Sequence, residues 1–248
     1  MMERNIAIVL AAGQGKRMNT VQKKQYLLLN EKPILYYSLR SFENSSRITD
    51  IIIVVGRNEK KYVQEEIINK FNLQKVRAIV EGGKERYHSV YYGIQSAAEI
   101  LETVETKDNN NYIWIHDGAR PFLSEEILVR AYKGVCDAKA CAVGMPVKDT
   151  IKIANEAGYI TTTPNRSLVW QIQTPQVFEF QLVQRAYSVL IEEEATLAER
   201  KLNVTDDAMV VETFTNQKVK LVEGEYKNIK ITTPEDLQIA KVFSESKT

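Results

Sequence analysis

Residues 5–26 read N-I-A-I-V-L-A-A-G-Q-G-K-R-M-N-T-V-Q-K-K-Q-Y. The apolar run from Ile6 to Leu10 lacks the alternation of a half-exposed strand and is typical of a parallel strand buried on both faces. Two alanines lead from it to Gly13 and Gly15, where the backbone can approach a ligand closely. Four basic residues follow within ten positions, namely Lys16, Arg17, Lys23 and Lys24. Clustered cations in a glycine turn favour a highly negative ligand such as a triphosphate.

Two common phosphate-binding motifs do not fit this loop. A Walker A motif requires Ser or Thr after Gly-Lys, and Arg17 stands there. A dinucleotide fingerprint requires a third glycine, and Met18 occupies that position. Taken alone, G-x-G-K-R fits two interpretations equally well: a phosphate site, or an ordinary strand-to-helix turn with solvated charges. Short glycine motifs often occur where no phosphate binds.

The composition is that of a globular protein. The 248 residues, 44% of them hydrophobic and 26% charged, can bury a large core, and we expect one domain over residues 1–248. A formal net charge of +1 gives no overall field that would recruit nucleic acid or an acidic membrane. No apolar stretch approaches the roughly 20 residues of a membrane span, and the run 6–12 is too short for a secretory signal. We therefore expect a cytoplasmic protein without nucleic-acid or membrane partners.

The cysteines and histidines are few. Cys136 and Cys141 are expected to be two buried, reduced thiols rather than a disulfide or a metal pair. His88 and His116 are the only histidines, so a transition-metal centre is disfavoured. The simplest interpretation of His116 is a packed side chain that orients its loop.

Strands and helices alternate along most of the chain. Short apolar runs predict strands, and amphipathic segments between them predict helices, which indicates βαβ units and a parallel sheet. Strands are expected at residues 51–55, 76–80, 112–115, 138–146, 218–223 and 228–232, and helices at 33–42, 62–71, 89–101, 125–135, 233–243, from 179 onward and within 192–200. Residues 150–154 and 159–163, separated by N-E-A-G, predict a β-hairpin that would be marginal unless it packed on something. Thr174 and Pro175 are expected to shape a turn that leads into the helix from 179.

Ligands of such sheets bind beyond the carboxyl ends of the strands. Gly82, Gly83 and Arg86 follow one predicted strand, Ser89 begins the next predicted helix, and Asp117 follows another strand. A carboxylate beside phosphates would be repelled unless a hard cation lay between them, so Asp117 is interpreted as part of a Mg²⁺ or substrate-hydroxyl site. The glycine pair also fits a simple turn before an ordinary helix.

A series of ordered motifs resembles a known enzyme family. A-A-G-Q-G-K-R-M at 11–18 with K-K-Q-Y at 23–26 looks like the signature of sugar- and polyol-phosphate nucleotidyltransferases. Then follow G-G-K-E-R at 82–86 with Ser89, H-D-G-A-R-P-F at 116–122, V-K-D-T at 147–150, Q-T-P-Q-V-F at 173–178, T-D-D-A at 205–208 and N-I-K-I-T-T-P-E-D at 228–236. Together they resemble the 2-C-methyl-D-erythritol 4-phosphate cytidylyltransferase family, from about Ile6 to Ala240.

The resemblance implies an α/β fold of the nucleotide-diphosphosugar transferase type. This is a Rossmann-like, mostly parallel twisted sheet with helices on both faces. A β-hairpin arm at about residues 149–165 would protrude from it and embrace the second subunit of a homodimer. CTP and 2-C-methyl-D-erythritol 4-phosphate would give 4-diphosphocytidyl-2-C-methyl-D-erythritol and pyrophosphate, in the non-mevalonate isoprenoid pathway. The expected cofactor is Mg²⁺, for which Mn²⁺ could substitute.

The family's functional residues are carried over position by position. The resemblance implies catalytic roles for Arg17, Lys24, Arg166 and Lys230. It implies nucleotide binding by Ala11, Ala12, Gly13, Gly15, Gly82, Gly83, Arg86 and Ser89. It implies substrate binding by Asp117, Arg120, Thr150, Thr174 and Thr205, with Asp117 also a metal ligand. Read locally, T-D-D-A at 205–208 is equally well a helix N-cap with an acidic first turn.

Two other functions remain open from the sequence. The related ribitol-5-phosphate cytidylyltransferases share the glycine loop and the H-D motif, whereas V-K-D-T, W-Q-I-Q-T-P-Q-V-F at 170–178 and T-D-D-A favour the methylerythritol enzymes. A CTP-binding regulatory protein without turnover belongs to a different class. The intact set Arg17, Lys24, Asp117, Arg166 and Lys230 argues against it.

Overall fold

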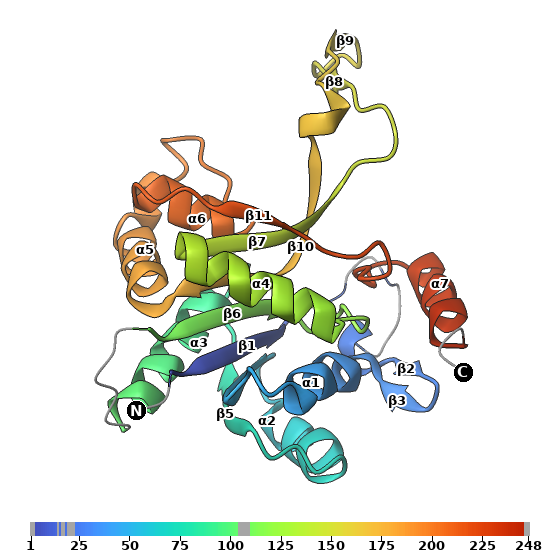
Figure 1. The fold of residues 1–248 in the computed structure, drawn as a ribbon, viewed down its shortest axis with the longest axis vertical. Coiled ribbons are helices and arrows are strands. Elements are labelled where there is room, and N and C mark those ends of the chain that lie inside the picture. Colours follow the sequence, from blue (N-terminus) through green and yellow to red (C-terminus); the bar gives the residue numbers. More distant parts are fainter. Residues whose placement is uncertain (1–2, 14, 16–17, 19–22, 104–109, 246–248) are drawn as a thin grey trace.

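A mostly parallel sheet forms the centre of the molecule. The computed structural model describes residues 3–13, 15, 18, 23–103 and 110–245, and within them seven strands form one sheet in the order β11-β7-β10-β6-β1-β4-β5 (Figure 1). The strands are β1 (Asn5–Ala11), β4 (Asp50–Val55), β5 (Val76–Glu81), β6 (Tyr112–Asp117), β7 (Ala140–Pro146), β10 (Trp170–Glu179) and β11 (Lys220–Glu223). Only β10 is antiparallel to its neighbours β6 and β7. The expected sheet is therefore confirmed.

Helices cover both faces of this sheet, as expected. One face carries α1 (Ile34–Asn44), α2 (Lys60–Val63) with its π-helical continuation η3 (Gln64–Asn69), and α4 (Glu125–Ala138); the other carries α3 (Arg86–Glu102), α5 (Phe180–Glu192) and α6 (Asp207–Phe214). Ala7 and Val9 of β1 pack with the first layer, whereas Ile6 and Ile8 pack with the second. Because successive strand residues point to opposite faces, an unbroken apolar run is required here.

The C-terminal helix and a small hairpin form a third cluster. Helix α7 (Pro234–Glu245) packs against β2 (Leu28–Leu29), which pairs with β3 (Lys32–Pro33). Their shared core consists of Leu29, Ile34, Phe122, Ile231 and Ala240, all buried. The backbone N–H of Ile231 donates to the carbonyl of Ala119 at 2.9 Å, so this cluster adjoins the loop that follows β6.

The predicted arm is present and stands away from the body of the molecule (Figure 1). Strands β8 (Ile153–Ala154) and β9 (Ile160–Thr162) pair antiparallel, and every residue in them is exposed. A short 3₁₀ turn, η4 (Arg166–Leu168), follows before β10. The strands are shorter than the sequence predicts, because the arm has no sheet on which to extend its pairing.

Two predicted elements are wrong. Residues 228–232 form no strand; instead Asn228 is fully buried, and its side-chain amide donates to the carbonyl of Thr174 at 2.9 Å and to Oε1 of Gln173 at 3.1 Å. Side-chain hydrogen bonds therefore hold this segment in place of a strand ladder. The charged run 192–200 is not a helix face, since α5 ends at Glu192 and a 3₁₀ turn, η5 (Glu194–Thr196), follows.

Two further details need correction. Thr174 and Pro175, predicted to shape a turn, lie inside β10, where the pairing with β7 shifts between Ile172 and Gln176. A proline is tolerated at such an irregularity because no ladder hydrogen bond is lost there. Both cysteines are free as expected, but Cys136 is exposed on α4 and only Cys141 is buried.

Candidate active site

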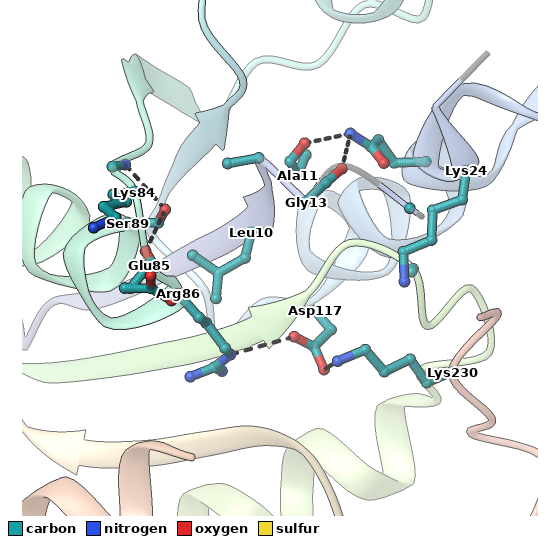
Figure 2. A pocket seen from close by; sticks show the side chains of 15 residues that line it. Leu10, Ala11, Gly13, Lys24, Lys84, Glu85, Arg86, Ser89, Asp117 and Lys230 are labelled. Atoms are coloured by element: carbon teal, nitrogen blue, oxygen red, sulfur yellow. Dashed lines mark hydrogen bonds and ion pairs between the residues drawn. The ribbon is translucent and has the colours of Figure 1, made fainter. Parts of the chain in front are cut away.

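A cavity of about 480 Å³ opens where β1, β5 and β6 end. It is lined by Leu10, Ala11, Ala12, Gly13, Gly15, Lys24, Gln25, Gly83, Lys84, Glu85, Arg86, Ser89, Asp117, Ala119 and Lys230 (Figure 2). Its size suits a small-molecule ligand. The carboxyl ends of parallel strands meet at one edge, so motifs far apart in sequence converge here. Ten of the predicted site residues line the cavity, together with five that were not predicted.

The glycine loop forms one wall of the cavity. Gly15 has φ of +63°, a left-handed conformation that favours glycine, and a β-carbon on it would lie 3.4 Å from Cγ of Lys24. A β-carbon on Gly13 would meet nothing within 4 Å, so this backbone faces open space. Lys24 Nζ donates to the carbonyl of Ile231 at 3.2 Å. Arg17, predicted to be catalytic, lies outside the described residues.

The turn between β5 and α3 forms the opposite wall. A β-carbon on Gly82 would lie 2.5 Å from Cβ of Ala12 and 2.6 Å from Oγ of Ser89, so only glycine lets the two walls approach. Ser89 Oγ accepts from the backbone N–H of Gly83 at 3.2 Å. Ser89 therefore braces the turn from within α3, which begins at Arg86 and not at Ser89 as predicted. Gly82 itself lines an adjoining cavity rather than this one.

Asp117 is the centre of a charged cluster at the base of the cavity (Figure 2). Its carboxylate lies 2.9 Å from Lys230 Nζ, 3.6 Å from Arg120 Nε and 3.8 Å from Arg86 Nε. Burial alone would raise the pKa of Asp117, but the charges of Lys230, Arg86 and Arg120 lower it well below its usual range. The carboxylate is therefore ionised at any physiological pH.

Arg86 is held from behind by a carboxylate that sequence reasoning missed. Its Nη1 and Nη2 each lie 2.7 Å from an oxygen of Asp207, which is fully buried and also accepts from the Tyr187 hydroxyl at 2.5 Å. Bidentate arginine–carboxylate pairs fix orientation as well as charge. In T-D-D-A it is Asp206 that caps α6, accepting from the N–H of Met209 at 2.9 Å. The sequence did contain a signal for the role of Asp207. An N-cap requires only one aspartate, and T-D-D-A has two.

A buried histidine and threonine orient the loop that carries Asp117. His116 Nε2 lies 3.3 Å from the carbonyl oxygen of Arg120, which can only accept, so Nε2 carries the proton. Nδ1 then accepts from the Thr174 hydroxyl at 3.0 Å, and that hydroxyl accepts from the N–H of Asp117 at 3.1 Å. Burial, more than any neighbouring charge, lowers the pKa of His116 to about 4. His116 is thus a neutral, packed histidine, as predicted.

Two predicted substrate-binding residues lie behind the cavity. Arg120 is buried, and its Nη1 donates to the carbonyl of Asn228 at 2.7 Å. Thr174 is buried against His116, as described above. Both support Asp117 and neither lines the cavity. Among the residues that were not predicted, Gln25 anchors the glycine loop, because its amide donates to the carbonyl of Ala11 at 2.5 Å.

Three other predicted residues lie elsewhere on the chain. Thr150 and Arg166 are exposed at the two ends of the arm, where Arg166 Nη1 donates to the carbonyl of Lys148 at 3.0 Å. Thr205 is exposed before α6. None of the three lines the cavity. Within a single chain they and the cavity residues therefore do not form one site.

The residues described by the structure contain no group of three or more His, Cys, Asp or Glu side chains that could hold a metal ion. A Mg²⁺ ion in proteins is commonly held by only one or two carboxylates, with substrate phosphates and water supplying the rest. Asp117 and Glu85 both line the cavity. The donor set therefore suits Mg²⁺ only together with a phosphate ligand. No helix in the described parts of the chain is long and apolar enough to cross a membrane.

Comparisons with known proteins agree with this geometry. The family model described as 2-C-methyl-D-erythritol 4-phosphate cytidylyltransferase matches residues 5–246. A protein of that name from Lachnoclostridium phytofermentans is 48% identical over 242 residues, covering 98% of this chain and 97% of its own. Another, from Caldanaerobacter subterraneus subsp. tengcongensis, is 46% identical over 237 residues, covering 96% and 97%.

Solved structures give the same result. A crystal structure of 4-diphosphocytidyl-2C-methyl-D-erythritol synthase from Anaerococcus prevotii superposes with a TM-score of 0.79 at 31% identity, covering 98% of this chain and 96% of the other. The cytidylyltransferase from Francisella tularensis gives 0.74 at 26%, covering 97% and 99%. These matches favour the methylerythritol enzymes over the two alternatives left open by the sequence. The chain belongs to the 2-C-methyl-D-erythritol 4-phosphate cytidylyltransferase family of nucleotidyltransferases.

Proposed function

We propose that this chain transfers the cytidylyl group of CTP to 2-C-methyl-D-erythritol 4-phosphate. The products are 4-diphosphocytidyl-2-C-methyl-D-erythritol and pyrophosphate. Besides family membership, one observation carries the proposal: a glycine loop, Lys24, Lys230 and the Asp117 cluster converge on a single cavity. Three cations against two carboxylates, Asp117 and Asp207, leave that cluster positive. Such a cavity suits two phosphate-bearing ligands.

The reaction needs electrostatics more than proton transfer. A phosphomonoester carries nearly two negative charges at neutral pH, since its second pKa is about 6, so its oxygen is already a nucleophile. That oxygen attacks the α-phosphorus of CTP, and the bond to the β-phosphate breaks as pyrophosphate leaves with the electron pair. The obstacle is repulsion between two anions, which fixed cations and backbone donors relieve as charge develops.

The residues of the cavity have separate roles in this reaction. Lys24 stabilises the charge that develops on the transferred and leaving phosphates, and we assign the same role to Arg17 from the sequence. Lys230, which already pairs with Asp117 at 2.9 Å, positions the methylerythritol phosphate together with Arg166. The nucleotide is bound by the turn between β5 and α3, through Gly83, Arg86 and Ser89.

We propose Mg²⁺ as the cofactor, with Mn²⁺ able to substitute. Asp117 would hold it, because this carboxylate stays ionised and lines the cavity. The bound ion would neutralise charge on the triphosphate. The chain's own residues still have to place the two substrates and exclude water between them.

We propose further that the arm completes the site of a second subunit in a homodimer. Several large apolar side chains on and beside the arm are exposed: Ile151, Ile153, Tyr159, Ile160 and Leu168. An isolated two-stranded ribbon is marginal alone, so a partner chain is its natural packing surface. Thr150 and Arg166, at the ends of the arm, would then reach the partner's phosphate substrate. The two free thiols are in keeping with work in the cytoplasm.

Pyrophosphate release tests the proposed reaction. Purified chain should release pyrophosphate with CTP and 2-C-methyl-D-erythritol 4-phosphate, and far more slowly with UTP, ATP or GTP. Ribitol 5-phosphate should be a poor acceptor. Faster turnover with ribitol 5-phosphate would overturn the acceptor assignment, and CTP binding without any pyrophosphate release would indicate a regulatory protein.

A further inference from the structure

A carboxylate outside the cavity ties together the two ends of the segment that carries Lys24. Glu59 lies between β4 and α2, and its Oε2 accepts from the Tyr26 hydroxyl at 2.9 Å and from the Gly56 N–H at 2.9 Å. Its Oε1 pairs with Lys23 Nζ at 2.5 Å. Lys23 and Tyr26 flank Lys24 on either side. We name Glu59, Lys23, Tyr26 and Gly56 the Glu59 clamp.

The clamp is a built arrangement and not a surface ion pair. The Glu59 side chain is only 16% exposed, and Tyr26 is buried with its ring edge-on to Tyr62 at 5.0 Å. A β-carbon on Gly56 would lie 2.5 Å from Lys23 Nζ and 2.8 Å from Glu59 Oε2. Any larger residue at position 56 would therefore displace the ends of both side chains from the positions in which they pair. Hydrogen bonds to an ionised carboxylate are roughly twice as strong as those between neutral groups.

The segment between the clamped residues is fixed from the other side as well. Gln25 is buried, and its amide donates to the carbonyls of Ala11 and Gly13 at 2.5 and 3.3 Å. The backbone closes a 3₁₀ turn, η2 (Lys24–Tyr26), through Tyr26 N to Lys23 O at 2.9 Å. The backbone of Lys24 is thus held between β1 on one side and the end of β4 on the other.

We propose that Glu59 is a positioning residue for Lys24. The catalytic role of Lys24 in this inference rests on the proposed function. The clamp itself rests only on the hydrogen bonds and the ion pair of Glu59. A lysine is a point charge on a flexible stem, so its backbone must be fixed for the charge to meet the reacting phosphates. Misplacement by about 1 Å can cost a catalytic group about 10²-fold in rate. Loosening the clamp should have a smaller effect than removing Lys24.

The first test separates positioning from folding. Glu59→Gln should lower kcat about tenfold, with KM for CTP changed less than about twofold. Gly56→Ala should act in the same direction, because the new methyl displaces two flexible side-chain ends without removing the carboxylate. Glu65→Gln, which alters an exposed glutamate 4.0 Å from Lys61, is the matched control and should match wild type. Melting temperatures of the variants report on folding.

The second test asks whether Glu59 acts through Lys24. In a Lys24→Ala background, Glu59→Gln should cause little further loss, because residues acting as a unit are not additive. If the two losses multiply, Glu59 does not act through Lys24 and the proposal is overturned. A kcat for Glu59→Gln equal to wild type would overturn it as well.

A third measurement does not depend on turnover. Amide hydrogen exchange over residues 23–27 should be faster in Glu59→Gln than in wild type or Glu65→Gln, since the clamp closes this turn. Unchanged exchange would overturn the clamp even if the enzyme is active as proposed. Absence of turnover in wild type, with faster exchange in the variant, would instead reject the proposed function and retain the clamp.

Discussion

The cavity and the two ends of the arm both carry residues that the family resemblance singles out, yet the surroundings of the cavity and of the arm are opposite. In the cavity, the Asp117 side chain is 12% exposed and lies among three cations. On the arm, Tyr159 is 74% exposed, and Leu168, in the turn that follows the arm, is 77% exposed. The buried carboxylate of the cavity is thus paired with cations of its own chain, whereas the apolar groups of the arm are exposed to water. The difference suggests that the body is preorganised and that the arm becomes functional only against a second subunit.

Stability follows the same division. The body has a seven-stranded sheet with two buried layers, while the arm pairs only Ile153–Ala154 with Ile160–Thr162. Perturbing the cavity should therefore affect chemistry without affecting assembly. Perturbing the arm should affect assembly without affecting the fold of the body.

The largest effect should come from removing divalent cations. In excess chelator, turnover should fall to background, because Asp117 with the triphosphate would no longer hold Mg²⁺. Added Mg²⁺ or Mn²⁺ should restore it, and chelator saturated beforehand with Mg²⁺ is the control. The proposed dimer, measured by sedimentation, should be unaffected. Undiminished turnover in excess chelator would show that the reaction does not require a divalent cation.

Removing the cation on the glycine-loop side should come next. Lys24→Ala should lower kcat about 10²–10³-fold, the usual cost of losing one electrostatic group that acts in the transition state. KM for CTP should change much less. Lys61→Ala, at a lysine whose side chain is 85% exposed, is the control. Arg17→Ala should behave like Lys24→Ala. If kcat and CTP affinity fall equally in either variant, that residue only binds the nucleotide and does not act in the transition state.

The buried histidine should make the body sensitive to acid. The pKa of His116 is lowered to about 4, so between pH 6.5 and 4 the unfolded chain binds a proton that the folded chain does not. Stability should therefore fall as the pH falls through this window, by about 3 kcal/mol. His116→Gln keeps a donor and an acceptor and should flatten this dependence, measured by urea unfolding at several pH values. An unchanged slope would mean that other groups cause the acid loss.

The convergence of the cavity could be predicted from the sequence because it depends on local signals. Apolar runs locate β1 and β6, and parallel strands bring Gly13, Gly83 and Asp117 to one edge. Pairings across the chain could not be predicted. Arg86 and Asp207 are 121 residues apart, and nothing in either neighbourhood specifies the other.

Misassigned elements have a similar cause. Thr174-Pro175 reads as a turn because proline is rare in central strands, yet β10 lies between β7 and β6 with its irregularity at that point. Residues 228–232 have a strand-like pattern, but the bonds of the Asn228 side chain and the burial of Ile231 determine their conformation. In both segments, tertiary contacts determine the backbone conformation and override the preference of the local sequence.

The smallest effect should come from the arm surface. Replacing Tyr159 and Ile160 with serine should weaken self-association about tenfold or more, because two large apolar side chains lose their packing surface. Turnover should then fall on dilution, while the melting temperature of the body stays the same. Ile239→Ser, at an exposed apolar position on α7, is the control. Unchanged association would leave the arm without its proposed partner.

Complementation between two inactive chains tests the central claim, that each site combines the cavity of one chain with the arm of another. Lys24→Ala chains and Arg166→Ala chains are mixed under conditions that exchange subunits. If sites are shared, one site of each heterodimer collects both lesions and the other collects neither, so activity should return toward about half that of the wild-type dimer. If Arg166 serves its own chain, every site keeps one lesion. No recovery despite verified heterodimers would contradict the shared site.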